Sequence, residues 1–133
     1  MTTEAVKALD TPYASDVLTN DPELKFAVRS GHLYMVDIDL VVDSSTDGVD
    51  ALLCQTVAPG NDAADRMWAE GDDKQAEQPV EACSPDNTGE SFVRLHARVY
   101  AGADGTCHVQ FSNDDNGGTV TVKRGSRVTA RQV

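Results

Sequence analysis

The sequence predicts an all-β domain: a jelly-roll-like antiparallel β-sandwich over residues 21–133, preceded by an N-terminal arm. Apolar and polar residues alternate through most of the chain, with the period of about two that marks half-buried strands. Clusters of Gly, Asn, Asp and Ser interrupt these runs at a spacing typical of sandwiches. Almost no segment shows a helical period, and 133 residues suffice for one domain with one core.

The first 20 residues are weakly patterned, and we expect them to form an extended arm outside the sandwich. As an alternative, Ala5, Val6 and Leu9 could line one short helical face. Pro12 would limit such a helix, because proline disrupts helix interiors. The N-terminus also lacks the basic and apolar regions of a secretory signal, so we expect synthesis in a cytoplasm.

Three strands are predicted in the first half of the sandwich. Runs at 24–29 and 32–43 alternate regularly and are joined by a turn at Ser30 and Gly31. A third run at 49–57 follows the turn cluster DSSTDG. The apolar face of the second run consists of Tyr34, Val36, Ile38, Leu40 and Val42, while two aspartates mark its opposite face as partly solvent-exposed.

A long polar loop is predicted at about residues 58–90. Gly, Asn, Asp, Pro and Glu dominate it, and its bulky apolar residues are Met67, Trp68 and Val80. A short strand or turn around Met67 and Trp68 would give so long a segment a structural role. An isolated Trp either folds a loop onto the core or anchors a partner, and the sequence leaves both interpretations open.

Regular alternation resumes in the second half of the chain. We predict strands at 91–101 and 106–112, separated by the turn AGADG. The predicted inward side chains are Val93, Leu95, Ala97, Val99, Cys107, Val109 and Phe111, and the outward ones in the first strand are Phe92, Arg94, His96, Arg98 and Tyr100.

Residues 117–133 carry four basic residues and no acidic one, which could indicate a nucleic-acid-binding tail. A disordered basic tail lacks apolar periodicity, whereas here Val and Ala recur at every second position on both sides of a turn at Arg124–Ser126. We therefore predict a closing pair of short strands. Val120, Val122, Val128 and Ala130 face the core in this interpretation, while Lys123, Arg127 and Arg131 face outward.

The whole chain is strongly acidic, with 22 acidic and 11 basic residues and a net charge of −11. The acids are spread along the chain, and 16 of them are Asp. This distribution fits a surface adapted to high salt, where the Debye length is only about 3 Å, or an ordinary acidic protein. In both cases nucleic-acid binding is disfavoured over most of the surface. No apolar run is long enough to cross a bilayer, so we expect no membrane partner.

No catalytic signature is present, and we expect neither an enzyme nor a bound cofactor or metal. Cys54 and Cys107 lie in apolar runs and should be buried, while Cys83 lies in the loop; this odd count without a CxxC spacing argues against a disulfide framework or a zinc knuckle. His96 and His108 lie on neighbouring predicted strands and could be close together. Two exposed polar residues are the simpler interpretation of that pair, because no metal-binding spacing accompanies them.

Two acidic turns, DSSTDGVD and NDDNGG, could bind cations weakly. The first resembles the start of a calcium loop, but Cys54 stands at position 12, where the loop requires a bidentate acid. Both stretches are typical of plain hairpin turns, since Asn, Asp and Gly tolerate the left-handed backbone that tight turns need.

The order of these features resembles a β-sandwich domain that is common among structural proteins of tailed viruses. The opening run of that family, with the pattern L.F.V..G..Y.V, is similar to Leu24, Phe26, Val28, Gly31, Tyr34 and Val36. Its closing run is similar to Gly105, Val109, Phe111, Gly118–Val122, Gly125, Ser126, Val128, Ala130 and Val133. The similarity covers about residues 21–133, and the Pro- and Glu-rich residues 71–85 depart from it.

This resemblance implies a virion protein, most simply a homotrimeric capsid decoration or turret protein that binds the major capsid protein. The acidity would then fit a virus of haloarchaea. A tail, baseplate or fibre protein is the alternative within the same class, and a cellular carbohydrate- or ligand-binding sandwich is the alternative from another class. The candidate partner-interface residues are Met67, Trp68, Arg94, Arg98, Arg127 and Arg131.

Overall fold

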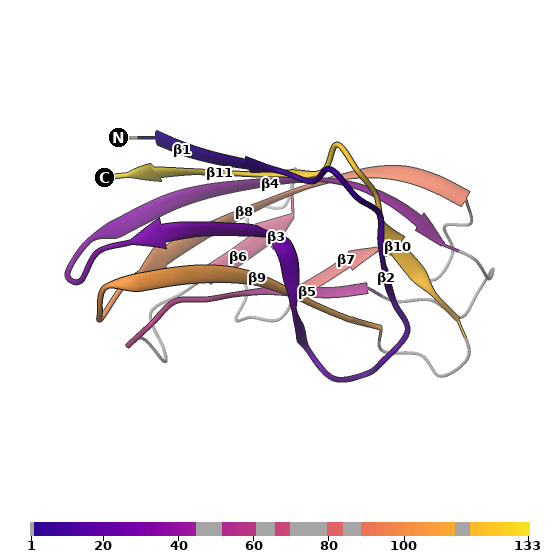
Figure 1. Ribbon diagram of the computed structural model, residues 1–133, viewed down its shortest axis with the longest axis horizontal. Helices are drawn as coiled ribbons and strands as arrows, with labels where there is room; N and C mark the ends of the chain where they lie inside the picture. The colour runs from indigo at the N-terminus through magenta and orange to yellow at the C-terminus, as the bar shows by residue number, and fades with distance from the viewer. Residues whose placement is uncertain (1, 45–51, 61–65, 70–79, 84–88, 114–117) are drawn as a thin grey trace.

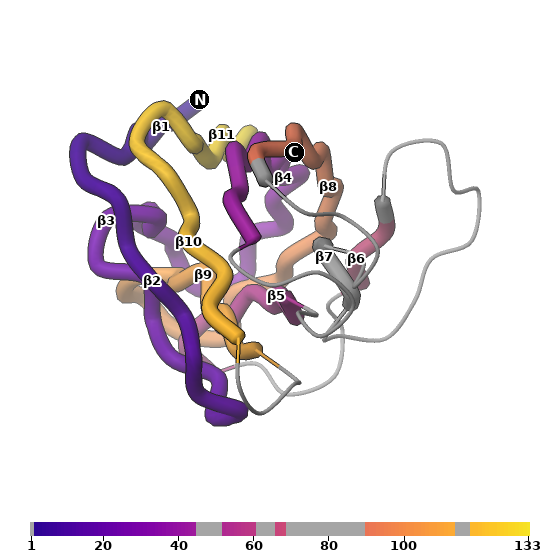
Figure 2. The backbone as a smooth tube through the Cα atoms, turned by 90° about the vertical axis from the view of Figure 1, so that its right-hand side faces the viewer, coloured from indigo at the N-terminus to yellow at the C-terminus, as the bar shows by residue number. Residues whose placement is uncertain are grey.

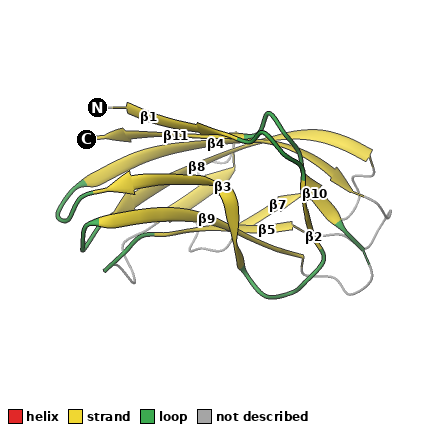
Figure 3. Cartoon of the chain, in the orientation of Figure 1, coloured by secondary structure: helices red, strands yellow, loops and turns green. Residues whose placement is uncertain are grey.

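The computed structural model describes residues 2–44, 52–60, 66–69, 80–83, 89–113 and 118–133. These residues form eleven β-strands in two antiparallel sheets, and none of them lies in a helix (Figures 1 and 3). The prediction of an all-β sandwich is therefore confirmed.

The larger sheet is centred on two long antiparallel strands, β4 and β8, which pair along their whole length. Strands β10 and β11 lie end to end along the other side of β4 and pair in turn with β2 and β1. Strand β6 pairs with the free side of β8. The bounds are β1 (Thr2–Val6), β2 (Thr11–Tyr13), β4 (Leu33–Ser44), β6 (Arg66–Ala69), β8 (Gly89–Tyr100), β10 (Val120–Val122) and β11 (Arg127–Gln132).

The smaller sheet has the order β3–β9–β5–β7. From β2 to β10, each strand lies in the opposite sheet from the one before it, so that the chain winds around the sandwich (Figures 1 and 2). Pairs such as β1 with β11 and β3 with β9 therefore join distant parts of the sequence, as in a jelly roll. The bounds are β3 (Thr19–Val28), β5 (Leu52–Val57), β7 (Val80–Cys83) and β9 (Gly105–Asn113).

The inner faces of the two sheets enclose one apolar core. The inward faces predicted for the strands that became β4, β8, β9, β10 and β11 are confirmed: all of these side chains are buried except Val93, which packs against the core while partly exposed. Leu24, Phe26 and Val28 of β3 and Leu52 and Cys54 of β5 cover the core from the smaller sheet.

One expected strand pairing is wrong: the two C-terminal strands do not pair with each other, and both pair with β4. The predicted turn at Ser30 and Gly31 is present, and Gly31 has a φ of 82°. This turn connects β3 and β4, which lie in different sheets. The alternating pattern predicts which side chains are buried, but it does not specify the neighbouring strand, and this explains the error.

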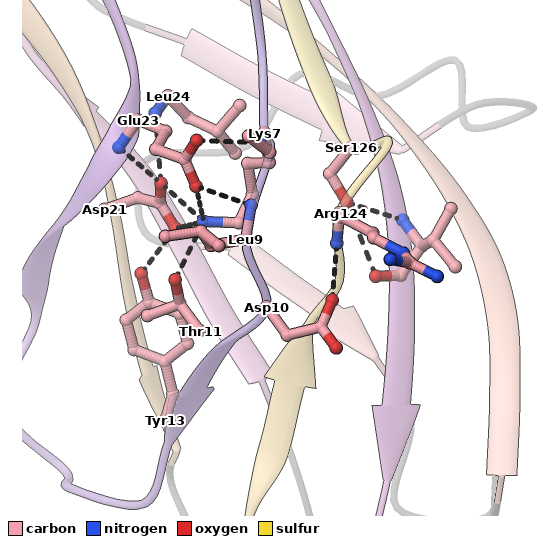
Figure 4. Close-up of polar contacts among 12 residues, drawn as sticks. Lys7, Leu9, Asp10, Thr11, Tyr13, Asp21, Glu23, Leu24, Arg124 and Ser126 are labelled. Carbon is pink, nitrogen blue, oxygen red and sulfur yellow. Dashed lines mark hydrogen bonds and ion pairs between the residues drawn. The ribbon is translucent and has the colours of Figure 1, made fainter.

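The N-terminal segment is not a separate arm. Residues 2–6 form β1 on the edge of the larger sheet, residues 11–13 form β2, and β3 begins at Thr19. The side chains of β1 are mostly exposed, which is why its apolar periodicity is weak. Lys7, which follows β1, is buried against Asp21 of β3 and fastens the segment to the sandwich (Figure 4).

The segment predicted as a polar loop at 58–90 contains β6, β7 and the start of β8. The short strand expected around Met67 and Trp68 is present as β6, whereas β7 has no clear signal in the sequence. Residues 61–65, 70–79 and 84–88 lie outside the described residues, and so do the acidic turns at 45–50 and 114–117.

Candidate functional site: the outer face of the larger sheet

The outward side chains of β1, β4, β6, β8, β10 and β11, together with Lys123 next to β10, form a continuous surface that we call the arginine face. It carries five of the seven arginines of the chain. It also carries Trp68, Phe92 and Tyr100, the only three of the seven aromatic side chains that are not buried. Because strand register aligns these residues in rows across the sheet, sequence segments far apart contribute to one surface.

The middle of this face is held by Asp39 of β4. Arg94 of β8 approaches one carboxylate oxygen at 2.6 Å, and Arg127 of β11 approaches the other at 3.0 Å. Burial by itself would raise the pKa of Asp39, but hydrogen bonds from both guanidinium groups hold that pKa below its usual value. Asp39 thus ties three neighbouring strands together, and Arg94 and Arg127, two of the four predicted interface arginines, are engaged within the subunit.

The adjacent row places Asp37, His96 and Trp68 side by side on β4, β8 and β6. His96 Nδ1 lies 2.7 Å from Asp37 Oδ1, and the ring centroids of His96 and Trp68 are 5.7 Å apart. Trp68 is therefore a half-buried residue of the outer face and does not plug the core. Met67 points the other way and is fully buried, so its prediction as an interface residue is wrong.

A third row is basic. Arg131 of β11 and Arg98 of β8 lie opposite Met35 of β4 from its two sides, and Arg66 of β6 lies opposite Arg98. The structure thus brings the predicted residues Arg98 and Arg131 onto one surface with Trp68, Arg94 and Arg127. Sequence reasoning missed Met35 and Arg66, whose only signal was their position in alternating runs.

His96 and His108, which the sequence allowed to be close together, are in different sheets. His108 belongs to β9 and lies between Lys25 and Val57, whereas His96 belongs to β8. They are separated because the chain crosses between sheets at the turn before β9. In the described part of the chain, no three His, Cys, Asp or Glu side chains are grouped so that they could hold a metal ion.

A second polar cluster lies inside the sandwich and was also missed by sequence reasoning. Lys7 Nζ donates to both carboxylate oxygens of Asp21 and to Thr11 Oγ1, and the Tyr13 hydroxyl donates to Asp21 at 2.6 Å (Figure 4). Burial and the neighbouring Asp21 raise the pKa of Tyr13 well above its usual value. Since Lys7 and Asp21 are fully shielded from solvent, this cluster is structural and offers no access to a substrate.

The expected burial of two cysteines is confirmed, since Cys54 and Cys107 are fully enclosed. Burial, followed by the charge of Asp21, raises the pKa of the Cys54 thiol. The side chain of Cys83 lies outside the described residues.

No protein-family model and no curated protein sequence matches this chain. Among solved structures, it resembles a chain from the "Structure of infectious bursal disease virus Gx strain", with 13% identity and a TM-score of 0.30. The alignment covers 98% of this chain but only 38% of that chain. No functional conclusion follows from a similarity of this size, and the likeness to tailed-virus proteins stays a prediction.

The arginine face shares part of its composition with protein interfaces. Aromatic residues, Met and Arg are enriched in such interfaces, whereas Lys, Asp and Glu are depleted, and this face carries few lysines but several acids. Among the described residues of this face, Lys123 is the only lysine, and its Nζ atom lies 3.6 Å from Glu90 Oε2. Within the described residues, no helix could cross a membrane.

Proposed function

We propose that this chain is a non-catalytic structural protein of a virion. In this proposal it forms a homotrimer that decorates the capsid of a tailed virus, bound to the major capsid protein. The observation that carries the proposal is the arginine face, an extended interface-like surface on an otherwise acidic β-sandwich. A rigid sandwich that presents one such face is suited to linking neighbouring proteins by many weak contacts.

The described surface is less suited to a small ligand. A cleft of about 180 Å³ opens at the edge between the two sheets, where Thr3, Arg29, Tyr34 and Gln132 are among its lining residues. Ligand pockets usually measure about 300–1,000 Å³ and present several aromatic groups. Only one aromatic side chain, Tyr34, lines this cleft, so this cleft does not support the alternative of carbohydrate or ligand binding.

The sequence resemblance supports the fold and adds little beyond it. Its residues in the first run, such as Leu24, Phe26 and Val28, are core positions of β3, and Gly31 supplies the left-handed turn that follows.

Cosedimentation with separated virion parts tests the proposal. The purified chain would be mixed with isolated heads and, separately, with isolated tails of the virus that encodes it, and each mixture would be separated on a density gradient. We expect the chain to migrate with heads in a fixed ratio to the major capsid protein. Migration with tails alone would support the tail alternative, and migration with neither would refute a virion role.

A further inference from the structure

We propose that the arginine face binds a second copy of this chain in a heterologous contact, in which the face of one subunit meets an acidic surface elsewhere on the next. This inference rests on the proposed function, because it names the partner that the face contacts in the assembled trimer. It also assigns the contact to a particular row of residues, Arg131, Met35 and Arg98.

The first argument is the uncompensated charge of this row. No acid of the described residues lies within ion-pair distance of Arg98 or Arg131, although Arg94 and Arg127 on the same strands share Asp39. Arg98 and Arg131 lie opposite Met35 of β4, one from each side. In a chain with twice as many acids as bases, this row thus offers two arginines to which an external carboxylate could bind.

The second argument is the charge of the partner. The arginine face carries six basic and five acidic residues: Arg66, Arg94, Arg98, Lys123, Arg127 and Arg131 against Glu4, Asp37, Asp39, Asp43 and Glu90. The rest of the chain therefore holds 17 of the 22 acidic residues and only 5 of the 11 basic residues. The remainder of the chain is therefore acidic on average, and its charge is complementary to this face.

The third argument concerns the type of contact. In a face-to-face dimer, the free arginines would meet a surface whose acids are mostly engaged already. Asp39 binds two arginines, Asp37 binds His96, and Glu90 binds Lys123. A heterologous contact supplies carboxylates from outside this face, and such contacts generate closed rings when the rotation between subunits closes.

The size of the face is sufficient for a stable contact. At about 4.8 Å between strands and 3.3 Å per residue, its strands cover about 700 Å². A standard interface buries about 800 Å² on each partner. Phe92 is 64% exposed and Tyr100 is 40% exposed, so apolar anchors flank the arginine row at both ends of β8.

The salt dependence of binding distinguishes a second copy of the chain from a polyanion as the partner of the arginine face. Two copies that each carry a charge of −11 repel at long range, and salt screens this repulsion more than it weakens desolvated contacts in an interface. Association of copies should therefore strengthen with salt. Binding of a nucleic acid or another polyanion would weaken, because it depends on counterion release.

The decisive measurement is sedimentation velocity of the full chain at 0.1 M and 2 M KCl, as wild type and as an Arg98→Glu/Arg131→Glu variant. Lys25→Glu/Arg29→Glu is the matched control, because Lys25 of β3 and Arg29 directly after β3 are both exposed and the change in charge is identical. Circular dichroism would verify that each variant is folded. We expect trimers for wild type and control at 2 M KCl, and at least tenfold weaker association for the Arg98/Arg131 variant.

A mixing experiment tests the heterologous geometry. The variant keeps its acidic surfaces, so a labelled variant should still bind the face of wild-type subunits and stop ring closure, giving mixed dimers in native mass spectrometry. The absence of mixed species would overturn the heterologous contact. A monomeric wild type at both salt concentrations, or equal dissociation of the control, would overturn the inference as a whole. These readouts use the purified chain alone, so a failure to bind virions refutes the proposed function without affecting them.

Discussion

Lys7 Nζ and Asp21 Oδ2 are 2.8 Å apart, and both side chains are fully shielded from solvent. Lys7 directly follows the edge strand β1 of the larger sheet, while Asp21 lies in β3 of the smaller sheet. The same carboxylate accepts the Tyr13 hydroxyl and the backbone N–H groups of Glu23 and Leu24 (Figure 4). This contact joins the two sheets on one side of the sandwich and orders the N-terminal segment.

Replacing Lys7 with Met should lower the free energy of unfolding by about 3–5 kcal/mol, because it leaves the Asp21 carboxylate buried without its cation. The Lys7→Met/Asp21→Asn double variant should lose less stability than the two single variants together, with a coupling energy above about 1 kcal/mol. Urea denaturation of the four proteins measures this cycle. Lys25→Met, at an exposed position, should change stability by less than about 0.5 kcal/mol. Strictly additive effects would contradict the role given to the pair.

Acid should destabilise the protein partly through Asp21. Burial alone would raise the pKa of Asp21, but hydrogen bonds from Lys7, Tyr13 and two backbone N–H groups hold it below its usual value. A carboxyl with a lowered folded pKa contributes stability above its unfolded pKa of about 3.9, and this contribution is lost as the pH falls through the folded pKa. Free energies of unfolding measured between pH 7 and pH 2 should therefore fall below about pH 4. Asp21→Asn should flatten that fall, and parallel curves for the two proteins would refute the assignment.

Asp39→Asn should lower the free energy of unfolding by about 1–2 kcal/mol, since it removes the charge that Arg94 and Arg127 share. The value lies at the low end for charged hydrogen bonds because both arginine side chains are nearly half exposed. Thermal and urea denaturation would both report it. Asp37→Asn is the matched control on the same face of β4. The Asp37 side chain is 61% exposed, so this substitution should lower the free energy of unfolding by less than half as much as Asp39→Asn.

Gly102→Ala should destabilise the protein by about 1–3 kcal/mol through overpacking. Gly102 follows β8 and donates its backbone N–H to Pro59 O at 3.0 Å. A Cβ atom there would collide with backbone atoms of Gly60, so that one of the two segments would have to shift. Ala103→Ser at the neighbouring exposed position should be nearly neutral in the same unfolding experiment. Equal stability of both variants would show that the two segments separate without cost.

The sequence alone was sufficient to determine the fold class and most of the buried faces. Inward positions such as Ile38, Leu95 and Val122 follow from alternation, which is a local property: in a strand, successive side chains point to opposite sides whatever strand lies beside it. For the same reason, the outward positions of Arg98, Arg127 and Arg131 were predicted correctly although no partner was known.

Only the tertiary structure decided which strands are neighbours, because the partners in a wound sandwich are far apart in the sequence. The pairing of β1 with β11 turned a predicted arm into a sheet edge, and the crossing before β9 separated His96 from His108. Lys7 and Asp21 are ordinary charged residues in the sequence, and their role appears only where the two sheets meet. The arginine face likewise exists only because β11, β4, β8 and β6 align their outward residues in rows, which depends on long-range register and not on local pattern.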